Sequence, residues 1–207
     1  MLLSRSAVEE LYTRRIDRYG SFIAAFQSPQ GTQALLQRSH LLRAGLRVLD
    51  AGCGFGMVTF AFLEALRERN LDYEAVDAFD LTPAMLARFH DELETRGVTR
   101  VQVQQADVLA LETLPPSWTN YDLIISASML EYLTKREFPR ALAELRARLS
   151  PNGYILILIT RKNRKQRFSS TGGGMPNGIP RTNCCALSPR RGSETPYSTD
   201  FPRVTSG

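Results

Sequence analysis

The fold is decided by the stretch Val48-Leu49-Asp50-Ala51-Gly52-Cys53-Gly54-Phe55-Gly56. Residues 46–50 form a short apolar run, which is typical of a buried strand. The three glycines that follow alternate with other residues and predict a tight loop whose backbone a ligand can approach closely. Apolar residues then return at helical spacing over residues 58–69. The stretch therefore predicts a strand, a glycine loop and a helix in succession.

The same alternation of strands and helices continues outward from this stretch. Further apolar strands are predicted at residues 73–79, 101–103, 122–126 and 154–159, and helices at residues 6–20, 32–42, 83–96 and 137–149. Continuously apolar strands that alternate with helices indicate an α/β fold with a doubly wound, mostly parallel sheet and helices on both faces. We expect residues 43–160 to form this domain, with residues 1–42 as a helical lid or flank.

Residues 161–207 differ in composition from the rest of the chain. They contain Gly172-Gly173-Gly174 and nine of the 26 Lys and Arg residues, but only two of the 21 Asp and Glu residues. This basic, Gly-, Pro- and Ser-rich segment predicts a disordered tail. The positive net charge of the protein therefore belongs to the tail, and a nucleic-acid-binding function would depend on the tail alone.

The totals also exclude several classes of protein. No run of about 18 apolar residues is present, so neither a membrane span nor a secretory signal is expected. The three cysteines, Cys53, Cys184 and Cys185, have the spacing of neither a disulfide framework nor a metal site. We therefore expect a cytoplasmic protein without a bound metal.

The acid in front of the glycine loop predicts the charge of the ligand. Dinucleotide sites use the spacing G-x-G-x-x-G, and here Met57 stands in place of the third glycine. An anionic Asp50 would repel a pyrophosphate and attract a cation. A ligand that carries an ammonium group and a sulfonium, such as S-adenosylmethionine, suits this field better than a nicotinamide dinucleotide.

Two further aspartates follow predicted strands. Asp80 ends the second strand, where a carboxylate can accept both hydroxyl groups of a ribose. Asp77 is the alternative for this role, but Asp80 directly precedes the helix start at Thr82-Pro83 and is preferred. Asp107 follows the third strand and could accept from the amine of adenine, although a turn or cap aspartate is an equal alternative.

Together with Tyr121–Ser126 and Leu149–Gly153, these motifs resemble those of class I S-adenosylmethionine-dependent methyltransferases. The resemblance covers about residues 43–160 and implies a Rossmann-like methyltransferase fold with S-adenosylmethionine as cofactor. It implies that Asp50, Gly52, Cys53, Gly54 and Gly56 border the methionine part and that the backbone near Ser126 completes that part of the site. It also implies Asp80 and Leu81 for the ribose, Met85 near the adenosine, and Asp107 and Val108 for adenine. No catalytic side chain is assigned.

Motifs that the sequence lacks exclude some classes of methyl acceptor. The strand at residues 122–126 is not followed by the Asp/Asn-Pro-Pro-Tyr motif, and no lysine precedes Lys135. The first absence disfavours the methyltransferases of adenine and of glutamine amides, and the second disfavours the Lys-Asp-Lys-Glu ribose methyltransferases. A small-molecule acceptor is favoured, a protein acceptor stays open, and Glu131 and Tyr132 are candidates to face it.

The resemblance ends at about Thr160. Members of the family continue with a helix and an antiparallel hairpin of strands six and seven, and no such pattern is found in residues 161–207. We therefore hypothesise a truncated or frame-shifted chain in which residues 154–159 form an open edge. An impaired protein that binds the cofactor without turning it over is the alternative to an active enzyme.

Overall fold

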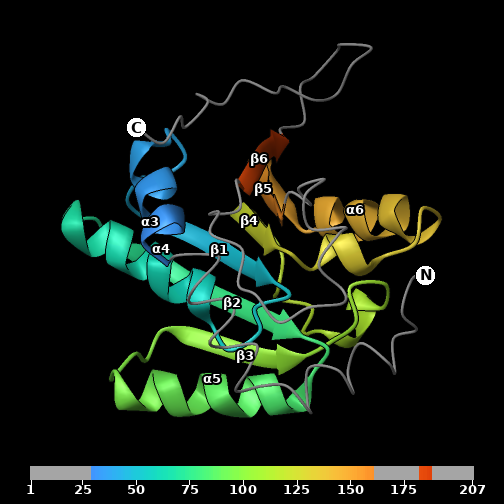
Figure 1. Cartoon of the computed structure of the whole chain (residues 1–207), viewed down its shortest axis with the longest axis horizontal. Helices are drawn as coiled ribbons and strands as arrows, with labels where there is room; N and C mark the ends of the chain where they lie inside the picture. Colours follow the sequence, from blue (N-terminus) through green and yellow to red (C-terminus); the bar gives the residue numbers. More distant parts are fainter. Residues whose placement is uncertain (1–28, 161–181, 188–207) are drawn as a thin grey trace, which may run out of the picture.

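A computed structural model describes residues 29–160 and 182–187 of the chain (Figure 1). Six strands form one sheet in the order β3-β2-β1-β4-β5-β6. Their bounds are Leu46–Ala51 (β1), Tyr73–Asp80 (β2), Val101–Gln105 (β3), Tyr121–Ala127 (β4), Leu149–Thr160 (β5) and Thr182–Leu187 (β6). Strands β1 to β5 are parallel, and β6 is antiparallel to β5. The predicted doubly wound, mostly parallel α/β sheet is confirmed.

Helices cover both faces of the sheet, as the alternation of elements requires. They are α3 (Pro29–Arg38), α4 (Met57–Glu68), α5 (Pro83–Thr95) and α6 (Glu137–Ala147), with short 3-10 helices η1 (Leu111–Thr113) and η2 (Leu130–Tyr132). Helices α3, α4 and α5 pack on one face, whereas α6 and both 3-10 helices pack on the other (Figure 1). None of the helices in the described residues is long and apolar enough to cross a membrane.

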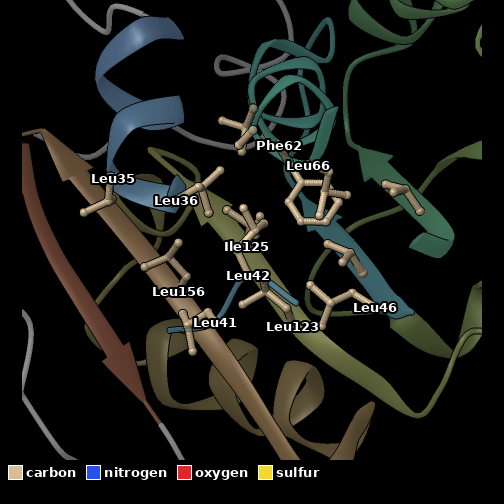
Figure 2. Close-up of a cluster of buried hydrophobic side chains, with 14 of the residues drawn as sticks. Leu35, Leu36, Leu41, Leu42, Leu46, Phe62, Leu66, Leu123, Ile125 and Leu156 are labelled. Atoms are coloured by element: carbon tan, nitrogen blue, oxygen red, sulfur yellow. The ribbon is translucent and has the colours of Figure 1, made fainter. Parts of the chain in front are cut away.

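Helix α3 is part of the hydrophobic core on the α4 face. Leu35 and Leu36 of α3 lie in one cluster with Phe62 and Leu66 of α4 and with buried residues of β1, β4 and β5 (Figure 2). The amides of Gln33 and Gln37 donate hydrogen bonds to the carboxylate of Glu68 in α4. The predicted helix at residues 6–20 lies outside the described residues.

Strand β6 corrects the expectation of an open sheet edge. Its residues pair with β5 from Ile155 opposite Leu187 to Thr160 opposite Thr182, so this edge of β5 is paired, whereas the absence of the family's strands six and seven stays a prediction. Backbone hydrogen bonds make this pairing and require no alternation of apolar and polar residues, which the sequence of β6 lacks. The predicted absence of strand seven concerns residues outside the described part.

Strand β5 also begins earlier than predicted. Leu149 pairs with Tyr121, and the pairing resumes with Tyr154 opposite Leu123 after an irregularity. The predicted turn at Asn152-Gly153 is thus an interruption within the strand. A side chain at Gly153 would collide with the carbonyl oxygen of Tyr121, which explains the glycine.

Candidate functional site

The carboxyl ends of β2, β1 and β4 lie side by side at one edge of the sheet. Asp50 of β1 is in register with Ala78 of β2 and Ile125 of β4. The sheet therefore brings Asp50, Asp80 and Ser126 to the same edge, where ligands bind in open α/β sheets.

The glycine loop is fastened to β2 through its backbone. The amides of Gly52 and Cys53 both donate to the carbonyl oxygen of Phe79, at 2.9 and 3.0 Å. Gly52 and Gly56 have φ angles of 77° and 88°, and a Cβ at either position would overlap a side chain, that of Met129 or of Phe89. These two glycines are therefore required by the packing of the loop itself.

Gly54 differs from the two glycines that flank it. A Cβ at this position would meet no atom of the described residues within 4 Å, so its outer side is open in this part of the structure. Its amide donates to Oδ2 of Asp80 at 2.9 Å. The middle of the loop therefore forms a cradle that a ligand can approach closely.

Asp80 links the loop to the start of α5. Its Oδ1 accepts from the amide of Thr82 at 2.9 Å, while its Oδ2 accepts from Gly54. Burial raises the pKa of Asp80, and these backbone donors oppose the rise. Each carboxylate oxygen can accept more than one hydrogen bond. The half-buried Leu81 and the buried Met85 lie close by in the chain, Met85 in the first turn of α5.

Asp50 is buried with one oxygen unsatisfied. Its Oδ2 accepts from the hydroxyl of Thr59 in α4 at 2.6 Å, whereas Oδ1 has no hydrogen-bond partner among residues 29–160 and 182–187. Its exposed fraction is 2%. Burial raises the pKa of Asp50 to about 7, opposed by the hydrogen bonds from Thr59 and increased by the charge of Asp80. A buried acceptor without a donor costs stability and is explained when a ligand supplies the donor.

Cys53 is a buried loop residue with a free thiol. Burial and the neighbouring charges of Asp50 and Asp80 raise the pKa of the thiol well above its usual value. The thiol therefore stays protonated and is unsuited to act as a nucleophile.

Asp107 and Val108 lie just beyond β3. Oδ1 of Asp107 accepts from the amide of Leu109 at 2.9 Å, which is the turn role considered above as the alternative. The side chain of Val108 is buried in the core of the α6 face. The amide of Ala106 donates to the carbonyl oxygen of Asp80, so this turn lies beside the end of β2.

The segment after β4 forms the other wall of the site. Ser126 is fully buried, and its hydroxyl finds no partner within the described segments. Ser128 adopts a φ of 60°, and its amide donates to the carbonyl oxygen of Leu158 at 2.9 Å. A non-glycine residue in this conformation is strained, and strained residues occur often at functional sites. The turn leads into Met129, whose side chain packs against Gly52.

Asp77, the alternative to Asp80, points to the opposite face of the sheet. Its Oδ2 accepts from the hydroxyl of Tyr121 at 2.7 Å and from Arg47 at 2.9 Å. These contacts hold β1, β2 and β4 together, so Asp77 belongs to the structural core. Neither Thr59 nor Met129 was expected at the site from the sequence. A threonine in the first turn of the helix after the loop was the available signal for Thr59.

Within the described part of the chain, no three Asp, Glu, His or Cys side chains come together as they would around a metal ion.

Comparison with known proteins places this geometry in a family. Residues 48–153 match the family model described as a methyltransferase domain. Malonyl-(acyl-carrier protein) O-methyltransferase from Halalkalibacterium halodurans is 31% identical over 112 residues, which are 53% of this chain and 37% of that protein. Ubiquinone biosynthesis O-methyltransferase from Xylella fastidiosa is 29% identical over 155 residues, 69% of this chain and 57% of the relative. The chain thus spans 37% to 57% of these two relatives.

Solved structures share the fold. The (4+2)-cyclase SpnF superimposes with a TM-score of 0.61 at 20% identity, covering 78% of this chain and 63% of SpnF. An S-adenosylmethionine (SAM) dependent methyltransferase from Aquifex aeolicus gives a TM-score of 0.53 at 21% identity, covering 74% and 72%. At these identities the similarity concerns the fold alone.

Proposed function

This chain belongs to the methyltransferase domain family, and we propose that it binds S-adenosylmethionine at the edge formed by β1, β2 and β4 and transfers the methyl group to a small-molecule acceptor. The observation that carries the proposal is the buried carboxyl of Asp50, whose Oδ1 has no partner in the described part of the chain, next to the open cradle at Gly54. An ammonium group is the donor that such an oxygen lacks.

The residues around the cradle suit the other parts of this cofactor. We assign the methionine part to the glycine loop and the backbone at Ser126, and the ribose to Asp80 and Leu81. The burial of the Met85 side chain supports a role in packing near the adenosine. We assign the adenine to Asp107 and Val108. The hydrogen bond from the amide of Leu109 to Asp107 fixes the turn that contains them.

Methyl transfer from this cofactor requires little catalytic action by protein side chains. When bound, the cofactor supplies a sulfonium that is already a good leaving group. The chain has to hold the acceptor in line with the methyl group and exclude water. The contact between Met129 and Gly52 closes the loop against the segment after β4, which supports a dry methionine end of the site.

The class of acceptor is inferred from two sources. The sequence lacks the motifs of adenine, glutamine-amide and Lys-Asp-Lys-Glu ribose methyltransferases, and the two named relatives act, by their names, on malonyl-(acyl-carrier protein) and in ubiquinone biosynthesis. We therefore place a small-molecule acceptor against the segment Ser128–Tyr132, with a carrier-bound acceptor as the form in which a protein would take part. The cytoplasmic location stays a prediction.

Calorimetric titration tests cofactor binding. S-adenosylmethionine and S-adenosylhomocysteine should bind the wild type, and NAD should not. Asp80→Asn removes a charged acceptor of the ribose hydroxyls, so we expect affinity to fall about tenfold to a hundredfold. The matched control is Asp91→Asn, since Asp91 is an exposed residue of α5. A folded protein that binds neither adenosyl ligand would refute the proposal, and binding would justify a screen of methyl acceptors.

A further inference from the structure

The first turn of α4 contains Thr59, a buried residue to which no part of the cofactor has been assigned. Thr59 is the third residue of α4 and is 1% exposed. Backbone amides in a first helical turn have no partner within the helix. Here the hydroxyl of Thr59 donates to Oδ2 of Asp50 at 2.6 Å. The start of α4 thus binds a carboxyl group from β1.

This contact fixes which oxygen of Asp50 remains available. Because Thr59 binds Oδ2, the carboxyl group is held in one orientation, and Oδ1 is the oxygen to which no described residue donates. Asp50 lies one residue before the end of β1, next to the glycine loop. An orientation of this kind is what a ligand-binding carboxyl group needs, since a freely rotating one would turn both oxygens toward any nearby donor.

The surroundings of Asp50 determine its protonation state. Among the described residues, the titratable groups that interact with it are Asp80 of β2 and the thiol of Cys53 in the loop; α4 presents the neutral Thr59, and the neighbour in β4 is Ile125. None of these groups is a cation. Burial and the charge of Asp80 favour the neutral carboxylic acid, with a pKa of about 7. A cation arriving at Oδ1 would reverse this preference.

We propose that Thr59 is a positioning residue that orients Asp50 toward the ammonium group of the cofactor, and that binding of this cation releases the carboxyl proton of Asp50 to solvent. The ligand keeps its three ammonium protons, the carboxylic acid becomes a carboxylate, and the proton passes to the buffer. The inference rests on the proposed function, because it requires an amino-acid ligand at this site.

The number of protons released on binding is the direct measurement. It is obtained by titrating S-adenosylhomocysteine in buffers of different ionisation enthalpy. With a pKa of about 7 in the empty protein, about 0.9 proton should be released at pH 6 and about 0.25 at pH 7.5. Affinity should be about eightfold weaker at pH 6 than at pH 7.5. Adenosine, which lacks the ammonium group, should bind without releasing a proton.

Variants at both positions test the role of Thr59. Thr59→Val keeps the shape but removes the hydroxyl, so the pH of half-release should move upward by about one unit. Thr59→Ser should restore the wild-type value. Asp50→Asn should bind with no proton release and with an affinity that does not change with pH. A purely structural role for Thr59 would lower the melting temperature of the valine variant and leave the pH of half-release unchanged.

The possible failures are distinguishable. Wild-type protein that binds no S-adenosylhomocysteine would overturn both the proposed function and this inference. Binding without proton release would overturn the inference and leave the proposed function intact. Proton release that persists in Asp50→Asn would assign the proton to Asp80 and likewise overturn the inference.

Discussion

Two aspartates are buried on opposite faces of the central strands, and their surroundings differ. Asp77 faces the α6 side, where its Oδ2 accepts from Tyr121 and from Arg47. Arg47 is itself held by the carbonyl oxygens of Ser117 and Thr119. Asp50 faces the α4 side, where Thr59 is the partner of one oxygen and no described residue is the partner of the other. Both carboxyl groups are 1–2% exposed, so burial does not distinguish them.

The comparison of Asp77 with Asp50 indicates where a buried carboxyl group can lack hydrogen-bond donors. A buried carboxyl group with its donors in place fixes neighbouring strands and belongs to the structure. One that lacks a donor lowers the stability of the empty protein, and such a group persists where a ligand completes it. Exceptions to the rule that buried polar groups are hydrogen-bonded are expected at functional sites, and Asp50 is such an exception.

The substitution Asp77→Asn should have the largest effect on stability. It leaves the guanidinium of Arg47 and the hydroxyl of Tyr121 facing a neutral amide in the core. Removal of one member of a buried charged pair typically destabilises strongly, so we expect the free energy of unfolding to fall by about 3 kcal/mol. Urea unfolding measures it. The affinity of the folded fraction for S-adenosylhomocysteine should stay within about threefold of wild type, since the site lies beyond the end of β2.

The control for this variant is Asp72→Asn. Asp72 pairs with Arg100 on the exposed surface, and exposed ion pairs contribute little to stability. Unfolding of Asp77→Asn at the same urea concentration as wild type would show that the network around Arg47 and Tyr121 is not structural, and the comparison of the two aspartates would fail.

Much of this arrangement could be predicted from the sequence. Apolar runs located the strands β1 to β5, and the helix signals at Pro83 and Glu137 matched the observed starts of α5 and α6. The place of Asp80 at the end of β2 was likewise predicted, while its preference over Asp77 for the ribose stays a prediction. These features are encoded locally, in the period of the apolar residues and in capping residues.

The remainder depends on contacts between distant segments. Whether Asp50 keeps a free oxygen depends on how α4 packs across β1, and no local pattern carries that information. The contact of Met129 with Gly52 joins two loops that are far apart in the chain. Strand β6 is located by its pairing with β5, and its sequence, Thr182–Leu187, does not alternate between apolar and polar residues. Tertiary geometry decides each of these.

The substitution Asp50→Asn should have the second-largest effect, in the opposite direction. The pKa of Asp50 is raised to about 7 in the folded protein from an ordinary value of 3.8. Wild type therefore binds this proton more tightly when folded and loses stability as pH rises from about 4 to 7. Asparagine cannot ionise, so the ligand-free variant should exceed wild type by about 2 kcal/mol at pH 8, allowing for its own unsatisfied amide.

Urea unfolding at pH 5 and pH 8 measures this difference. The advantage of Asp50→Asn should shrink at pH 5, where wild type is protonated, and should also shrink when S-adenosylhomocysteine saturates the wild type at pH 8. If the wild type were the more stable protein at pH 8 without ligand, Oδ1 of Asp50 would have to accept a hydrogen bond from another part of the chain.

The substitution Gly54→Ala should have the smallest effect on stability while it affects binding. At a φ of 55° an alanine is strained by about 1 kcal/mol, and its methyl group would touch no atom of the described chain. That methyl group would occupy the cradle beside Asp80, so the affinity for S-adenosylhomocysteine should fall at least about tenfold. Gly97→Ala is the matched control, because Gly97 has a φ of 64° and equally open surroundings but follows the far end of α5. It should lose similar stability and keep its affinity. Equal affinities for the two variants would show that the ligand does not enter the cradle at Gly54, and the incomplete network at Asp50 would then need another explanation.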